Sequence, residues 1–289
     1  MGEIRKAVVA GQFYEAVPSL LKKQIISCFL HELGPRKLPV EEKKKKNFVA
    51  AIVPHAGYMF SGPCAANAYF ELKKYTMKTI ILLGPNHTGI SSTDFSVSFS
   101  NFETPLGIVK NNLGLSKEIC EKTQAKHDET PHFQEHSIEV QLPFLQFIYK
   151  NFDIVPIVIS TSSYEACKKF ASELVSTIKK KKTSIAVLAS SDFTHFGFHY
   201  GFVPFVPNNN LEENLKKFDE KHIKAILALD SKSFYEYAKK TTICGAAPII
   251  VTMEICKAMN KKGRLLQHYT SSRIIKSNNA VGYASIIFE

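Results

Sequence analysis

Three short apolar runs, each followed within a few residues by a histidine, constrain this chain more than any other feature. The runs and their histidines are 48–53 with His55, 79–83 with His87, and 185–189 with His195. Short β-branched runs bounded by Gly, Pro, Asn or Ser are typical of buried strands in a parallel sheet. Ligands of open α/β sheets bind outside the carboxyl ends of such strands. We therefore predict that three imidazoles meet at one edge of a sheet, as a metal or catalytic centre.

The rest of the chain alternates helix-like and strand-like segments, which is typical of an α/β layer fold. Apolar spacing predicts helices at Val17–Leu33, Pro63–Lys74, Tyr164–Ile178 and Leu211–Leu229, with another apolar helix-like run at Ile249–Met259. Further strands are predicted at Phe95–Phe99, Ile108–Lys110, Ile154–Ile159 and Ala280–Phe288, and a surface loop at Pro204–Asn210. The chain has no internal repeat and no low-complexity linker, so we predict one α/β domain over residues 1–289.

Composition narrows the class of protein. Much of the net charge of +11 comes from two lysine runs, Lys43–Lys46 and Lys179–Lys182, which contain no aromatic residue or arginine. Each run falls between a predicted helix and a predicted strand, which favours solvated loops over a nucleic-acid-binding surface. No apolar stretch approaches the roughly 20 residues that span a membrane, and no secretory signal is visible. The six cysteines have no paired spacing, which predicts reduced thiols in a cytoplasmic protein.

Several residues near the histidines point to chemistry, and each also has a structural explanation. A lone histidine after a strand is commonly a hydrogen-bonded structural residue, but two in equivalent places, His55 and His87, favour a site. Asp192 precedes His195 by three residues and could fix its tautomer, or it could only cap the following turn. Glu135 and His136 could line the same cleft, although a local helix start explains them equally.

Cys244 is the cysteine whose position favours reactivity. It stands just before the apolar helix-like run, where the positive end of a helix dipole favours the thiolate. The alternative is a small buried side chain. Two imidazoles and one thiolate could bind zinc, iron or copper, and this donor set alone does not separate the three metals.

Six motifs in fixed order along nearly the whole chain resemble the Memo family, whose members are similar to the catalytic subunit of class III extradiol dioxygenases. The motifs are Gly11-Gln12-Phe13-Tyr14, Pro54-His55-Ala56-Gly57-Tyr58, Leu83-Gly84-Pro85-Asn86-His87, Glu135-His136-Ser137-Ile138-Glu139, Ser190-Ser191-Asp192-Phe193-Thr194-His195 and Thr242-Ile243-Cys244-Gly245. The resemblance implies a single-domain α/β/α sandwich around a central mixed sheet, with a cleft at the strand ends.

The resemblance also implies roles for individual residues. By motif matching, the metal ligands fall on His55, His87 and Cys244, and the acid–base positions fall on Asp192 and His195. The motifs bring three further residues to the predicted pocket, namely Tyr58, Glu135 and His136. Cys244 stands where the related dioxygenases have an oxygen ligand, which argues against ordinary ring cleavage, because a thiolate suits softer or redox-cycling ions.

These expectations lead to three hypotheses of function. The first is a cytoplasmic redox enzyme that holds one iron or copper ion, with zinc as the alternative, and acts on an unknown substrate. The second is a non-catalytic module whose cleft binds a small molecule or a peptide. The third is a metal-free enzyme with Cys244 as its nucleophile. Microbial members of the family are often found with a radical-SAM protein, so the resemblance also implies a functional link to such a partner.

Overall fold

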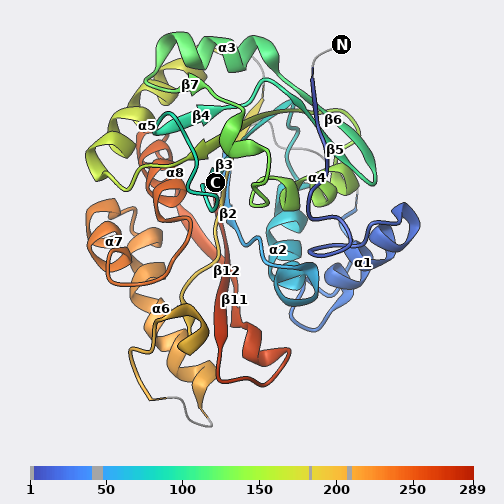
Figure 1. Ribbon diagram of the computed structural model, residues 1–289, viewed down its shortest axis with the longest axis vertical. Helices are drawn as coiled ribbons and strands as arrows, with labels where there is room; N and C mark the ends of the chain where they lie inside the picture. The colour runs from blue at the N-terminus through green and yellow to red at the C-terminus, as the bar shows by residue number, and fades with distance from the viewer. Residues whose placement is uncertain (1–2, 41–47, 182–183, 207–209) are drawn as a thin grey trace.

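The computed structural model describes residues 3–40, 48–181, 184–206 and 210–289, and it folds them around a mixed β-sheet with helices on both faces (Figure 1). The strand order is β1-β5-β6-β8-β3-β9-β2-β12-β10, with β11 paired to β12 and β4 paired to both β7 and β8. The strands are β1 (Ile4–Arg5), β2 (Val49–Val53), β3 (Thr79–Pro85), β4 (Phe95–Val97), β5 (Asn101–Thr104), β6 (Gly107–Asn111), β7 (Lys126–His127), β8 (Asp153–Ile159), β9 (Ile185–Ser190), β10 (His195–Phe196), β11 (Gly263–Thr270) and β12 (Ala280–Phe288).

The three histidine-linked runs form the centre of this sheet. Strand β9 lies between β3 and β2 and is parallel to both, so the carboxyl ends of the three strands share one edge. Strand β8 extends the parallel block beside β3, and β12 closes it on the other side, antiparallel to β2. Every residue of β2, β3 and β9 is buried, as their uninterrupted apolar sequences predict. The predicted fold class is therefore confirmed.

The helices form a layer on each face of the sheet. They are α1 (Pro18–Leu30), α2 (Tyr58–Leu72), α3 (Leu113–Lys122), α4 (Leu142–Ile148), α5 (Tyr164–Ile178), α6 (Leu211–Leu227), α7 (Ser231–Ala238) and α8 (Ala246–Ala258). One apolar core lies under α1, α2 and α4, and a second lies under α3, α5, α7 and α8 (Figure 1). No helix within the described segments is long and apolar enough to cross a bilayer.

Helix ends account for most differences from the predicted boundaries. Helix α5 and strand β12 have the predicted bounds, whereas α1 ends three residues early, at Leu30. His31 leaves the helical backbone there, and its ring nitrogen accepts the N–H of Leu33, which terminates the helix. Helix α2 starts at Tyr58, so Pro63 lies in its second turn instead of its first.

Some predicted loops fall partly or wholly outside the described residues. The first lysine run, Lys43–Lys46, lies entirely outside the described residues. Lys182 of the second run and residues 207–209 of the predicted loop lie outside them as well.

Candidate metal centre

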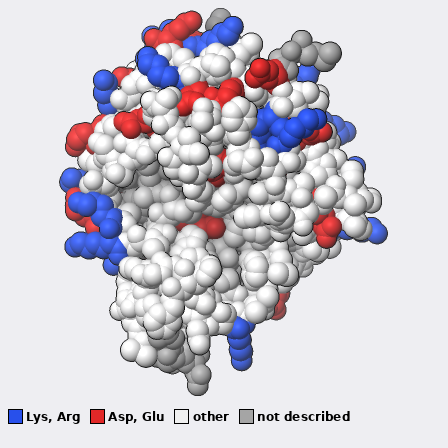
Figure 2. All heavy atoms as spheres, in the orientation of Figure 1, with Lys and Arg blue, Asp and Glu red and all other residues white. Residues whose placement is uncertain are grey.

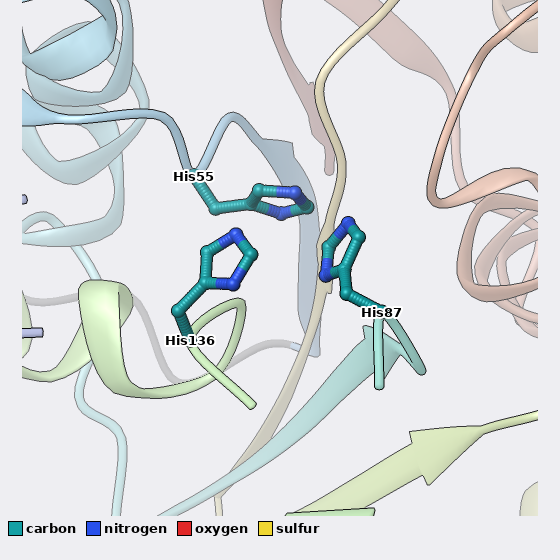
Figure 3. Close-up of side chains that lie close together, drawn as sticks. All are labelled: His55, His87 and His136. Atoms are coloured by element: carbon teal, nitrogen blue, oxygen red, sulfur yellow. The ribbon is translucent and has the colours of Figure 1, made fainter. Parts of the chain in front are cut away.

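Three imidazoles meet at the carboxyl edge of the central strands. His55 follows β2, His87 follows β3, and His136 comes from the segment before α4, and their rings point toward one another (Figure 3). One nitrogen from each ring lies within 4.8 Å of the others. The rings of His87 and His136 are stacked at 4.5 Å between centroids, and His55 meets His87 edge-on at 5.1 Å. The three imidazoles could therefore hold one metal ion between them.

Ser190, the last residue of β9, orients the ring of His55. Its hydroxyl donates to the carbonyl of Ser137 and accepts from the side chain of Gln141, so its oxygen faces Nδ1 of His55 at 2.9 Å as an acceptor. Nδ1 therefore carries a proton, and Nε2 is the ring nitrogen that faces Cys244. Asp192 fixes the backbone of His55, because its carboxylate accepts the His55 backbone N–H at 2.8 Å.

Glu135 orients His87 in a similar way. One carboxylate oxygen lies 2.9 Å from Nδ1 of His87, and the other accepts the His87 backbone N–H at 2.7 Å. Burial raises the pKa of Glu135, but the hydrogen bond and the charge of His87 outweigh it and lower the pKa to about 2. The carboxylate therefore stays ionised and keeps the proton of His87 on Nδ1. A carboxylate behind a histidine is the common support of a metal-bound imidazole.

Cys244 brings sulfur to the cluster. Its Sγ lies 3.3 Å from Nε2 of His55, and it also forms a hydrogen bond with His87. Burial raises the pKa of the thiol, but the charge of His55 and the hydrogen bonds from both rings lower it to about 5. Burial likewise lowers the pKa of His87, yet its hydrogen bonds to Cys244 and Glu135 raise it to about 10. Without an ion the group is thus a thiolate held by imidazoles, which is the ionised form of sulfur that binds metals.

His136 differs from the other two histidines. Burial, together with the charges of His55 and His87, lowers its pKa to about 3, so its ring is neutral. Its Nδ1 lies 3.6 Å from Glu135, beyond hydrogen-bonding distance, and its ring packs against that of Phe13 with 4.7 Å between centroids. The sequence places His136 in the pocket, and the structure brings it within reach of the same ion as His55 and His87.

His195 lies beside the cluster and is oriented by backbone. Nδ1 faces the carbonyls of Phe193 and Thr242, both at 3.0 Å, and because carbonyls only accept, this nitrogen carries the proton. Nε2 is left as an acceptor on a residue that lines the pocket. Asp192 does not make this bond; its oxygen binds the N–H groups of His55 and Ala56 instead. The sequence could not distinguish the two arrangements, because Asp192 and Phe193 both lie close to His195 in the chain and Thr242 lies 47 positions away.

The histidines line the base of a pocket of about 530 Å³. Its walls are largely aromatic or apolar, and they contain Phe13, Phe60, Tyr200, Ile275, Val281 and Tyr283. Within the described chain, no Lys or Arg lines it. Figure 2 shows that Lys and Arg lie mainly toward the edges of this view, around a hollowed and largely uncharged middle.

Three of the predicted site residues, Glu135, Tyr58 and Cys244, lie outside this lining. Glu135 is buried behind His87. Tyr58 is buried in the core beneath the pocket, with its hydroxyl donating to the carbonyl of Val140 at 2.7 Å. Cys244 lines an adjacent cavity of about 420 Å³, so the cluster lies between two hollows.

The N-terminal segment supports the cluster from outside. The buried carboxylate of Glu139 accepts hydrogen bonds from Val8 N–H, from Tyr14 and from Arg5. Arg5 also donates to the backbone carbonyl of Glu135. This network fixes the segment that carries both Glu135 and His136. Sequence analysis did not find the role of Arg5, because no local pattern links it to a residue more than a hundred positions away.

Similarity to known proteins identifies the family of this chain. The family described as Memo-like protein matches residues 5–287. A MEMO1 family protein of Saccharolobus solfataricus is 40% identical over 98% of this chain and 99% of its own length, and one of Methanopyrus kandleri is 36% identical over 98% of both. A crystal structure of an uncharacterized Escherichia coli K12 protein has a similar fold, with a TM-score of 0.54 and 11% identity over 84% of this chain and all of that one. The chain belongs to the Memo family.

Proposed function

We propose that this protein is a metal-dependent oxidoreductase that holds one iron or copper ion at His55, His87 and Cys244. The observation that carries the proposal is the contact of the Cys244 sulfur with Nε2 of His55, beside a second imidazole whose proton is fixed on Nδ1. Imidazole and thiolate donors together suit iron, copper or zinc, and a redox-active ion would supply electron transfer to a bound substrate. Zinc is the alternative occupant.

The residues around the ion have separable tasks. Ser190 and Glu135 hold the protons of His55 and His87 on Nδ1, which leaves Nε2 of each ring for the ion. His136 lies close enough to join them or to contact a substrate. His195 presents Nε2 to the pocket as a base, and the carbonyls on Nδ1 fix its tautomer.

The pocket favours a small, uncharged substrate. Its walls are aromatic and apolar, and the described lining has no Lys or Arg that could pair with a phosphate or a carboxylate once the histidines hold an ion. We therefore favour a small molecule over a phosphorylated peptide.

The test is metal content after anaerobic purification. We expect about one equivalent of iron or copper in the parent protein, and its loss in His55→Ala, His87→Ala and Cys244→Ala. Cys167→Ala is the matched control, because Cys167 is a buried core residue of α5. Equal metal loss in Cys167→Ala and Cys244→Ala, in folded proteins, would refute Cys244 as a ligand.

The same Cys–His contact supports a second candidate, a metal-free enzyme with Cys244 as its nucleophile and His55 as its base. Activity measured with and without metal distinguishes the two functions. A metal-free protein that turns over a substrate and loses that activity on alkylation of Cys244 would favour the nucleophile, whereas activity that returns only with added metal would favour the oxidoreductase.

A further inference from the structure

A second cavity lies at the edge of the sheet opposite the metal centre. It encloses about 730 Å³ and is bounded by Thr79 at the start of β3, by β6, and by Asp153 at the start of β8. This volume is within the range of pockets that bind cofactor-sized molecules. None of its lining residues takes part in the metal centre.

Three lysines from three separate segments line this cavity, namely Lys78, Lys110 and Lys150. All three are exposed, and none has an ion-pair partner among the described residues. The cavity lining includes one carboxylate, that of Asp153, so the lining carries an excess of two positive charges. This arrangement contrasts with the helix surfaces, where lysines such as Lys122, Lys217 and Lys232 pair with a glutamate one turn away. Unpaired lysines around a hollow attract an anion with more than one negative charge.

The wall beneath these lysines is apolar and aromatic. Phe152 and Leu106 are half-buried in it, and Ile108 is 52% exposed. The ring of Tyr149 packs beside Phe152, with 6.2 Å between centroids. A half-buried aromatic ring in a cavity wall offers a stacking surface to a flat heterocycle. The cavity therefore combines a cationic rim with a surface for a planar ring.

We propose that this cavity binds a nucleoside polyphosphate, with its base against Phe152 and its phosphates near Lys78, Lys110 and Lys150. The site is independent of the metal centre and of the function proposed for it. Because the lysines are exposed point charges, binding depends strongly on ionic strength.

The experiment is calorimetric titration of the full-length protein with ATP, inorganic tripolyphosphate and adenosine at low and high salt. The test variant is Lys78→Glu with Lys150→Glu, and the matched control is Lys217→Glu with Lys232→Glu, which changes the net charge by the same amount on α6 and α7. We expect ATP affinity to fall at least tenfold in the test variant and less than twofold in the control. A third variant, Phe152→Leu, should bring the affinity for ATP close to that for tripolyphosphate.

Thermal melting establishes that each variant is folded. Equal loss of ATP binding in both double variants would overturn the site, because it would show only an effect of net charge. Equal affinity of the parent protein for ATP and tripolyphosphate would overturn the nucleoside assignment. Absence of ATP binding at low salt, or tighter lysine-dependent binding of a single-stranded RNA oligonucleotide, would overturn the proposal as a whole.

Discussion

The substitution Glu135→Gln tests whether the carboxylate behind His87 controls the metal site. It keeps the size of the side chain and removes its charge. Glu135 is 2% exposed and its oxygens accept from the His87 ring, from the His87 backbone and from the N–H of Ser137. A glutamine oxygen can still accept from some of these donors, but its amide N–H₂ would meet another donor. The change therefore leaves His87 without a fixed tautomer.

Two magnitudes follow from the structure. A carboxyl pKa lowered from 4.5 to about 2 corresponds to about 3 kcal/mol at about 1.4 kcal/mol per pKa unit. Because the pKa is lower in the folded state, this stability is present above pH ~4.5 and is lost as the pH falls toward 2. A glutamine keeps part of the hydrogen bonding, so we expect the free energy of unfolding at pH 7 to fall by about 2 kcal/mol. Loss of a carboxylate behind a metal-bound histidine should weaken metal binding about 10- to 100-fold.

The assay is metal competition titration together with urea unfolding. Glu129→Gln is the matched control, since Glu129 also accepts two backbone N–H groups and a hydroxyl, from Phe99, Ser100 and Ser98, but does not touch the three-histidine cluster. We expect the control to lose stability and to keep its metal affinity. Metal affinity of Glu135→Gln within threefold of the parent, or equal weakening in Glu129→Gln, would refute the reasoning.

Three other predictions concern separate parts of the site. His195→Ala should keep the metal and lower substrate turnover about 100-fold or more, as seen in oxygen uptake, and metal loss as complete as in His55→Ala would make it a ligand. In metal-stripped protein, Cys244 should react with iodoacetamide at half its maximal rate near pH 5. Cys120 is the comparison, because burial raises its pKa and it should react only at alkaline pH. A midpoint above pH 8 for Cys244 would contradict the thiolate. Arg5→Lys should lower the free energy of unfolding by about 2 kcal/mol in urea titration, because one ammonium group cannot bridge the Glu139 carboxylate and the Glu135 carbonyl as the guanidinium does. A change below about 0.5 kcal/mol would exclude this role.

The part of the site that lies directly after central strands was predictable from the sequence. Apolar runs of β-branched residues identify β2, β3 and β9, and the rule that parallel strands share a carboxyl edge brings His55 and His87 together. No long-range information is needed for that step. Helix α5 was equally predictable, because its apolar face repeats at helical spacing throughout.

The roles of Tyr58 and His136 depend on packing that no local pattern encodes. Tyr58 is the last residue of the motif that contains His55, yet it is the first residue of α2 and is buried in the core. His136 belongs to an irregular segment between short 3₁₀ turns, where neither helical nor strand periodicity sets the direction of a side chain. Its place in the cluster comes from the Arg5–Glu139 contact and from packing against Phe13.

Two glycines explain how distant segments reach the ends of the strands. A Cβ on Gly84, in β3, would lie 2.4 Å from Oγ of Ser137, so only glycine lets the segment that carries His136 pack this closely on the strand that leads to His87. A Cβ on Gly245 would lie 2.4 Å from Cβ of Ser191, and the Gly245 N–H donates to the Ser191 hydroxyl at 3.0 Å. The loop that carries Cys244 can therefore lie against the end of β9. The parallel strands thus supply two of the imidazoles, and close backbone approach at these glycines allows the third imidazole and the sulfur to join them.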